Sequence, residues 1–201
     1  MYEIIQKGGI LIYPIIGLSV ISLAVFLERM FTLRSANFIP KVFMEKIQLF
    51  ISSKSIEEAR ALCDVQPCAV GNIIAQVLDN LHVPVSRITE IAEEAGRFEA
   101  RKLERFLPTL QTIANIAPLM GLLGTVFGMI KTFSVIAQQG VGNAQALSGG
   151  ISEALFTTAA GLSVAIPTVV FYHIVRHRSE KITGEMEKAV SQVINLLFKE
   201  G

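Results

Sequence analysis

The sequence predicts an all-α integral membrane protein with three transmembrane helices. Of its 201 residues, 51% are hydrophobic and only 17% are charged, which is more apolar than a typical soluble domain. The mean hydropathy of +0.52 points the same way. The apolar residues are concentrated in three runs, 10–27, 108–137 and 151–175. Each run is close to or above the ~20 residues that a helix needs to cross about 30 Å of hydrocarbon.

The distribution of lysine and arginine predicts how the three helices cross the membrane. All of these residues except Lys7 and Lys131 lie in residues 28–107 or after residue 175, and the loop 138–150 carries no charge. By the positive-inside rule, residues 1–9 and 138–150 are expected outside, whereas 28–107 and the tail 176–201 are expected in the cytoplasm. The N-terminus is therefore predicted outside the membrane and the C-terminus inside.

The long segment 28–107 is predicted to be helical. Ser55 and Glu58 have the spacing of a capping box and predict a helix start, and the stretch "VQPCAVG" ends that helix. Pro84 and Ser86 start another one. From Ser86 the helical spacing of apolar residues continues into the second apolar run without a cluster of turn residues. This pattern predicts a single helix of some fifty residues, about 75 Å long, that leaves the membrane and continues into the cytoplasm.

The C-terminal tail is predicted to extend the third transmembrane helix in the same way. One face of the tail is apolar and consists of Ile182, Met186, Ala189, Val193 and Leu197. Two of the three transmembrane helices are thus expected to extend into a long cytoplasmic helical bundle. Pro108, Pro118 and Pro167 are expected to kink these helices without ending them, which membrane helices tolerate.

The sequence offers little that would support enzymatic or metal chemistry. Cys63 and Cys68 have neither a second cysteine pair nor a nearby histidine, so they are interpreted as reduced, ordinary residues. His173 and His177 share a helix face at the cytoplasmic end of the third run, where interfacial anchoring is the favoured interpretation. No nucleotide-binding, nucleophile-elbow or HExxH motif occurs. We therefore expect no enzyme activity, no cofactor and no metal site, and the net charge of +1 gives no sign of nucleic-acid binding.

Stripes of small residues run along the second and third apolar runs. The second run has Gly121, Thr125, Gly128 and Thr132 on one face, and Gly124 forms a GxxxG motif with Gly128. The third run has Ala154, Thr158, Gly161 and Ala165 on one face, beside a second stripe of Glu153, Thr157 and Ala160. Two interpretations remain open. Small residues let helices pack closely, and threonine hydroxyls can also line an ion pathway.

The presence of Glu153 favours the interpretation as an ion pathway, because an ionised carboxylate that faces lipid costs several kcal/mol. The side chain must snorkel outward, face a water-filled cavity or stay protonated. Three helices cannot enclose a wet pore, so such a pathway requires several copies of the chain. Apart from Glu153, and Lys131 at the end of a run, the runs have no ionisable residue near mid-membrane. A proton relay needs a titratable group there, so the missing acid is expected from a partner.

The motifs "GLLGTVFGMIKTF", "GGISEALFTTAAGLSVAIP" and "ERMFTLRSA" resemble those of the MotA/TolQ/ExbB proton-channel family. The three-span layout with a large cytoplasmic segment is similar to the ExbB and TolQ branch, and the resemblance covers nearly the whole chain. It implies that Glu153, Thr125 and Thr158 line a pore. On a helical wheel Thr157 lies about 40° from Glu153 and Thr158 about 140°, so which of them faces the pore stays open.

The resemblance also implies partners and a location. It implies a homopentamer in the bacterial inner membrane that encloses the single transmembrane helices of two copies of an ExbD- or TolR-like protein. An aspartate of that partner would take up and release protons, and proton-motive force would drive a TonB- or TolA-like protein that acts on the outer membrane. Alternatives are a MotA-like flagellar or gliding stator and a non-conducting membrane scaffold. The choice between Ton and Tol systems, and between proton and sodium, stays open.

Overall fold

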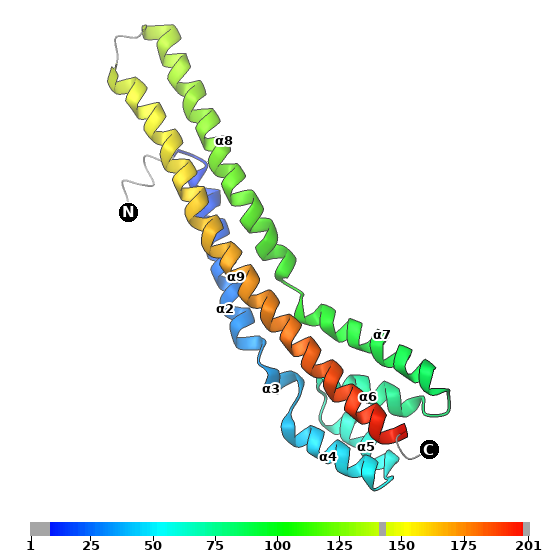
Figure 1. Ribbon diagram of the computed structural model, residues 1–201. Coiled ribbons are helices and arrows are strands. Elements are labelled where there is room, and N and C mark those ends of the chain that lie inside the picture. Colours follow the sequence, from blue (N-terminus) through cyan, green and yellow to red (C-terminus); the bar gives the residue numbers. More distant parts are fainter. Residues whose placement is uncertain (1–8, 141–143, 199–201) are drawn as a thin grey trace. The chain divides into compact units, whose positions relative to one another are not determined.

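The computed structural model describes residues 9–140 and 144–198, and within these ranges the chain is helical and forms no strand. The helices are α2 (Ile12–Thr32), α3 (Ser35–Phe38), α4 (Lys41–Ser52), α5 (Ile56–Val65), α6 (Ala69–Asp79), α7 (Val85–Leu103), α8 (Leu107–Gln139) and α9 (Ala144–Phe198). The all-α prediction is confirmed for this part of the chain (Figure 1).

Three of these helices are long and apolar enough to cross a membrane. They are α2 with 21 residues, α8 with 33 and α9 with 55. At 1.5 Å per residue even α2 reaches about 30 Å, the thickness of the hydrocarbon core. The prediction of three candidate transmembrane helices is therefore confirmed. The part of α9 beyond its apolar stretch continues without a break to Phe198, as the pattern of the tail predicted.

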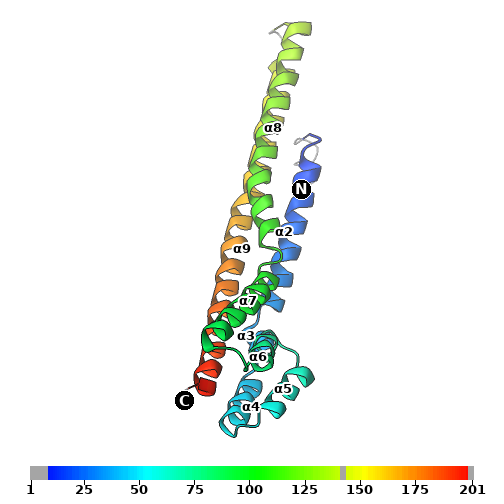
Figure 2. The same ribbon diagram turned by 90° about the vertical axis from the view of Figure 1, so that its right-hand side faces the viewer.

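The chain divides into two compact units, which are described separately. The first unit contains residues 1–28 and 106–174. In it, α8 and the first part of α9 run side by side in both views (Figures 1 and 2). Helix α2 contacts α9 through a buried hydrogen bond of 2.8 Å between the hydroxyls of Ser22 and Thr168 and through the stacked rings of Phe26 and Phe171, whose centroids are 4.1 Å apart.

The first unit leaves large apolar side chains exposed on all three of its helices. Val20 of α2, Phe133 of α8 and Ile166 of α9 are each more than 60% exposed. Exposed apolar surface of this extent on long helices is the surface that lipid tails or further membrane helices cover. This unit holds apolar stretches of all three candidate membrane spans, and we call it the membrane-embedded unit.

The second unit contains residues 29–105 and 175–201 and has its own apolar core. Side chains of this core that are at most 2% exposed include Phe43, Ile47, Ile73, Ile74, Val77, Ile88, Met186 and Val193. Polar contacts fix individual helices around this core. The Ser35 hydroxyl of α3 donates to the Glu185 carboxylate of α9, and the Asn72 amide of α6 donates to Glu99 of α7 at 2.9 Å.

The structure corrects the prediction of one continuous helix from Ser86 into the second apolar run. Helix α7 ends at Leu103 and α8 begins at Leu107, with a turn at residues 104–106. Pro108 explains the interruption, because it has no N–H to donate to the Glu104 carbonyl and its ring would collide with that carbonyl in a continuous helix. At the second position of α8 the missing N–H of Pro108 costs no hydrogen bond, because the N–H groups of the first helical turn have no acceptor within the helix. Sequence reasoning treated Pro108 as a kink, which is wrong, whereas Pro118 and Pro167 do lie inside helices.

Two smaller expectations also differ from the structure. Ser55 occupies the N-cap position of α5, as predicted, but its side chain makes no capping hydrogen bond, so the capping box is not formed. Helix α9 begins at Ala144, within the segment 138–150 that was expected to be a loop. Residues 141–143 of that segment lie outside the described residues.

Candidate functional site

Glycine residues bring the backbones of α8 and α9 into direct contact in the membrane-embedded unit. A Cβ atom on Gly161 would lie 2.5 Å from the Ala117 carbonyl oxygen and 3.1 Å from the Gly121 Cα. A Cβ atom on Gly121 would lie 3.1 Å from the Thr158 Cα. These distances are shorter than van der Waals contact, so only glycine fits at either position without a shift of backbone.

The same close contact continues toward the connection between the two helices. A Cβ atom on Gly124 would overlap the Thr157 side chain, and one on Gly128 would lie 2.7 Å from both the Ala154 Cβ and the Gly150 carbonyl oxygen. The positions repeat at intervals of three and four residues, so they lie on one face of each helix. We call this contact the α8–α9 seam, and define it as Gly121, Gly124 and Gly128 of α8 with Gly150, Ala154, Thr157 and Gly161 of α9.

The threonines singled out from the sequence all donate to backbone carbonyls. Thr158 donates across the seam to the Gly121 carbonyl oxygen at 3.0 Å, whereas Thr157 donates to Glu153 at 2.8 Å and Thr125 to Leu122 at 2.6 Å within their own helices. Thr157 is only 1% exposed, since it faces Gly124 in the seam. Thr125 and Thr158 keep part of their surface accessible. Of the two neighbouring threonines in α9, Thr158 is thus the one that retains accessible surface for contact with other groups.

Glu153 forms an ion pair in the membrane-embedded unit. Its Oε2 atom accepts a hydrogen bond from the Lys131 ammonium of α8 at 2.7 Å, and the side chains are 26% and 66% exposed respectively. Its Oε1 atom lies against Gly9, whose φ of +62° places it in the left-handed region where a Cβ atom would collide with that oxygen. The carboxylate is therefore held between α8 and Gly9, which lies three residues before the start of α2.

Sequence reasoning treated Lys131 as a residue at the end of a run and missed this ion pair. A signal was present in the sequence. Lys131 and Glu153 lie at equal sequence distances from residue 142, in the connection between the two helices. In a closely packed antiparallel pair of helices, residues at equal distance from the connection come to the same height. The pairing could have been predicted from the tight packing that the glycine stripes already indicated.

The two cysteines considered in the sequence are buried core residues of the second unit. Cys63 and Cys68 are free and buried, and burial raises the pKa of the Cys63 thiol to about 11. Cys68 caps α6, where its sulfur accepts from the Gly71 N–H at 3.3 Å. The described residues contain no group of three or more His, Cys, Asp or Glu side chains that could hold a metal ion.

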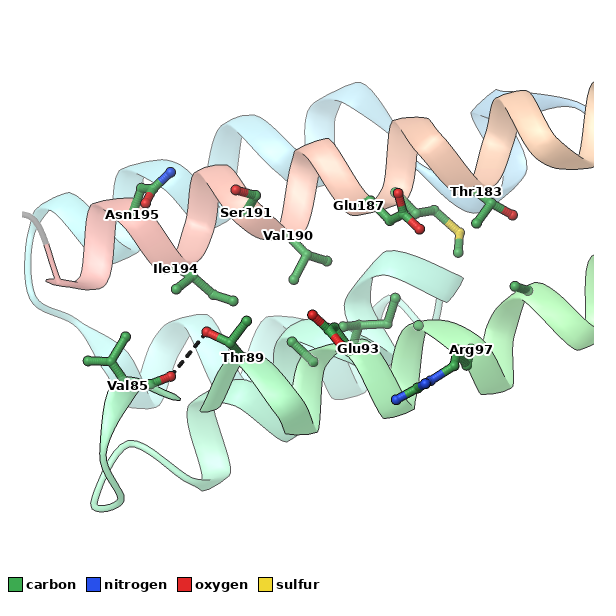
Figure 3. Close-up of a pocket in the computed structure, with 15 residues that line it drawn as sticks. Val85, Thr89, Glu93, Arg97, Thr183, Glu187, Val190, Ser191, Ile194 and Asn195 are labelled. Atoms are coloured by element: carbon green, nitrogen blue, oxygen red, sulfur yellow. Dashed lines mark hydrogen bonds between the residues drawn. The ribbon is translucent and has the colours of Figure 1, made fainter. Parts of the chain in front are cut away.

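A groove of about 680 Å³ lies between α7 and the C-terminal part of α9 in the second unit (Figure 3). Its walls alternate apolar side chains with Glu93, Arg97 and Glu187, and the Thr89 hydroxyl donates to the Val85 carbonyl at 3.1 Å. The charged groups are spread along the groove and do not converge on one point (Figure 3). None of the residues predicted as a site from the sequence lines it.

Comparison with known proteins identifies the family. Residues 68–188 match the model of the MotA/TolQ/ExbB proton channel family. A Synechocystis protein named ExbB-like 3 is 32% identical over 191 residues, which cover 85% of this chain and 82% of the relative. The biopolymer transport protein ExbB of Aquifex aeolicus is 41% identical over 134 residues, 63% of this chain and 89% of the relative.

A relative from the Tol branch is similar over a shorter part. The Tol-Pal system protein TolQ of Pseudomonas aeruginosa is 34% identical over 131 residues, which cover 65% of this chain and 51% of the relative. Three findings lead to one conclusion: the motifs that suggested the resemblance, the three apolar helices, and the match of the family model over more than half of the chain. The chain belongs to the MotA/TolQ/ExbB proton channel family and is similar to its ExbB and TolQ members.

Proposed function

We propose that this chain is the channel subunit of an inner-membrane motor of the ExbB–ExbD or TolQ–TolR type. The motor uses proton-motive force to energise a TonB- or TolA-like protein for outer-membrane transport or envelope maintenance. The observation that carries this proposal is the placement of Glu153 in a chain of this family. It is a partly exposed carboxylate within an apolar helix, bonded to Lys131 of the neighbouring helix.

The membrane-embedded unit supports an assembly of several copies. A charged pair within apolar helices requires water or protein around it, because exposure to lipid is costly. The described part of one copy offers three candidate spans, which are too few to enclose a wet pathway. The exposed apolar faces of α2, α8 and α9 provide surface for neighbouring copies as well as for lipid. We propose a homopentamer around the single transmembrane helices of two ExbD- or TolR-like partners, as the resemblance to the ExbB and TolQ branch implies.

In the proposed mechanism, some side chains position the helices and others orient water in the pathway. The glycines of the α8–α9 seam hold the two helices together, which fixes the height of Glu153 relative to α8. Thr125 and Thr158 keep accessible surface, so we place them along the pathway, where their oxygens would orient water. Thr157 is buried in the seam and is assigned to helix packing. The acid that takes up and releases the proton is proposed to belong to the partner.

The proposed orientation puts residues 1–9 and 138–150 in the periplasm and both the segment 28–107 and the tail 176–201 in the cytoplasm. It follows from the position of all but two of the lysines and arginines. A tag at Asn143 is expected to react with a membrane-impermeant reagent in intact spheroplasts. A tag at Gly201 is expected to react only after permeabilisation. Equal reactivity of both tags before permeabilisation would contradict three crossings of the membrane.

The experiment that tests the function is proton uptake by vesicles. The full-length chain is purified with a candidate ExbD- or TolR-like single-span partner, and native mass spectrometry establishes the copy number. The complex is then reconstituted, and a trapped pH dye reports proton entry under an imposed potential. The proposal predicts proton entry that depends on both proteins. A non-conducting scaffold, the competing function, predicts assembly with no more proton entry than empty vesicles.

A further inference from the structure

We propose that Lys131 acts as a tethered counter-ion that keeps alkali cations away from Glu153 and makes the pathway selective for protons over Na⁺. The inference rests on the proposed function, because it assumes that Glu153 borders the ion pathway. It goes further by assigning the ion and a specificity-determining residue. The observation behind it is the 2.7 Å contact between the Lys131 Nζ and the Glu153 Oε2.

The three apolar runs make this pair exceptional in the sequence. Among Asp, Glu, Lys and Arg, the predicted transmembrane segments 10–27, 108–137 and 151–175 contain only Lys131 and Glu153. The only lysine or arginine of these runs therefore contacts their only carboxylate. A charged residue inside a membrane helix pairs with an opposite charge where one is within reach. The pair is neutral as a whole, so Glu153 presents no net negative charge to an approaching cation.

Both oxygens of the carboxylate are in contact with the chain. The ammonium lies at Oε2, and the backbone of Gly9 lies so close to Oε1 that a Cβ atom there would collide with it. The lysine side chain is 66% exposed and the glutamate 26%, so the lysine is the more accessible member of the pair. A cation that enters from water thus encounters the ammonium before it can reach the carboxylate.

The chemistry of the two candidate ions explains the selectivity. A hard cation such as Na⁺ gives up hydration water only where several oxygens replace it, and a carboxylate supplies the charge at such a site. The ammonium already occupies one of the two carboxylate oxygens and repels a second cation. A proton needs one lone pair and no coordination shell, and it neutralises the carboxylate that accepts it. Lys131 therefore obstructs Na⁺ binding for both steric and electrostatic reasons, whereas protonation remains possible.

A purely structural role for Lys131 is the competing interpretation. The two helices are already in backbone contact close to the pair, where Gly128 of α8 meets Gly150 and Ala154 of α9. In the water-filled pathway that the proposed function assumes, an ion pair between partly exposed side chains adds little to stability. Helix packing in this region therefore does not require the lysine, and its loss should change ion selectivity more than assembly.

The test compares Na⁺ and proton entry into the same vesicles. The full-length chain with its single-span partner is reconstituted as wild type, Lys131→Gln, Lys131→Arg and Lys131→Gln/Glu153→Gln, and native mass spectrometry verifies the assembly of each. Uptake of ²²Na⁺ and the signal of a trapped pH dye are recorded. Lys181→Gln is the matched control, because it removes an exposed lysine from the second unit.

The expected result is that Lys131→Gln takes up ²²Na⁺ at least about tenfold faster than wild type, because a repulsive charge a few Å away is removed. Lys131→Arg and Lys181→Gln should exclude Na⁺ as wild type does. The double variant Lys131→Gln/Glu153→Gln should not show the faster ²²Na⁺ uptake of Lys131→Gln. Wild-type exclusion of Na⁺ by an assembled Lys131→Gln complex that still takes up protons would overturn the inference and leave the proposed function intact. Na⁺ entry through the wild type at the proton rate would also overturn it. If the wild type admits neither ion, the proposed function fails and the inference fails with it.

Discussion

The Thr158 hydroxyl of α9 donates a hydrogen bond of 3.0 Å to the carbonyl oxygen of Gly121 in α8. This oxygen is also positioned to accept from the amide four residues later in its own helix, so it serves a second donor. The bond is possible because Gly121 and Gly161 bring the two backbones together. It fixes the height of α9 against α8 in the membrane-embedded unit.

We expect Thr158→Val to weaken the α8–α9 seam by about 1 kcal/mol, because interhelical hydrogen bonds in membranes contribute on this scale. The side chain keeps its shape and loses only the donor. The free energy of unfolding in mixed micelles, measured by titration with SDS, checks this value. Thr158→Ser, which keeps the hydroxyl, should stay close to wild type. Equal stability of the valine variant would show that the bond has no energetic role.

Gly161→Ala is expected to destabilise the membrane-embedded unit by about 1–3 kcal/mol, because the added methyl group would overlap backbone atoms and force the helices apart. The Cβ atom would lie 2.5 Å from the Ala117 carbonyl oxygen. The same titration measures the effect. Gly17→Ala in α2 is the matched control, since nothing lies within 4 Å of its Cβ position. If both alanine variants behave alike, Gly161 is not a packing residue.

Glu99 is expected to be the polar group on which the second unit depends most. It is 6% exposed, and its Oε1 atom accepts from Asn72 at 2.9 Å and from Lys102 at 2.7 Å. Glu99→Leu should destabilise this unit by about 1–3 kcal/mol, because the Asn72 amide is left without its acceptor. Thermal unfolding followed by circular dichroism measures the change. The double variant Glu99→Leu/Asn72→Leu should recover part of the loss, and a larger loss in the double variant would argue against the proposed coupling.

Alkaline pH should destabilise the second unit through its buried thiols. Burial raises the pKa of Cys63 from 9.0 to about 11, and it raises the pKa of Cys68 in the same direction. Below pH 9 the thiols are protonated in both the folded and the unfolded chain, and their contribution is fully present. Above it the unfolded chain loses protons that the folded chain keeps, so stability falls as pH rises toward 11. Cys63→Ala should show a shallower decline, and an unchanged slope would exclude Cys63 as a cause.

Much of the fold could be predicted because hydrophobic periodicity records which side of a helix is buried. The three apolar helices and the continuation of α9 into the tail follow from this pattern. The interruption between α7 and α8 was missed because a proline inside an apolar pattern has two outcomes. Pro118 and Pro167 remain within helices, whereas Pro108 stands at the start of one. Which outcome occurs depends on whether neighbouring groups satisfy the freed carbonyl, and a single sequence does not specify those neighbours.

The residues of the candidate site were named from the sequence, but their contacts were not. The glycine and threonine stripes indicated a close approach of two helices, and the structure places Gly121, Gly124 and Gly128 against α9. The burial of Thr157 was not predictable from a wheel drawn around Glu153, because the wheel does not contain the partner helix. The Lys131 contact was missed for the same reason.

The most direct test of the central claim is the initial rate of proton uptake by vesicles that contain the complex with wild-type, Glu153→Gln or Glu153→Ala chain. Glutamine keeps the size and the hydrogen-bonding groups but not the charge, and alanine removes the polar head as well. Native mass spectrometry first establishes that all three complexes assemble alike. The account predicts that both variants lose most of the proton uptake of the wild type. An assembled Glu153→Ala complex that takes up protons at the wild-type rate would contradict it.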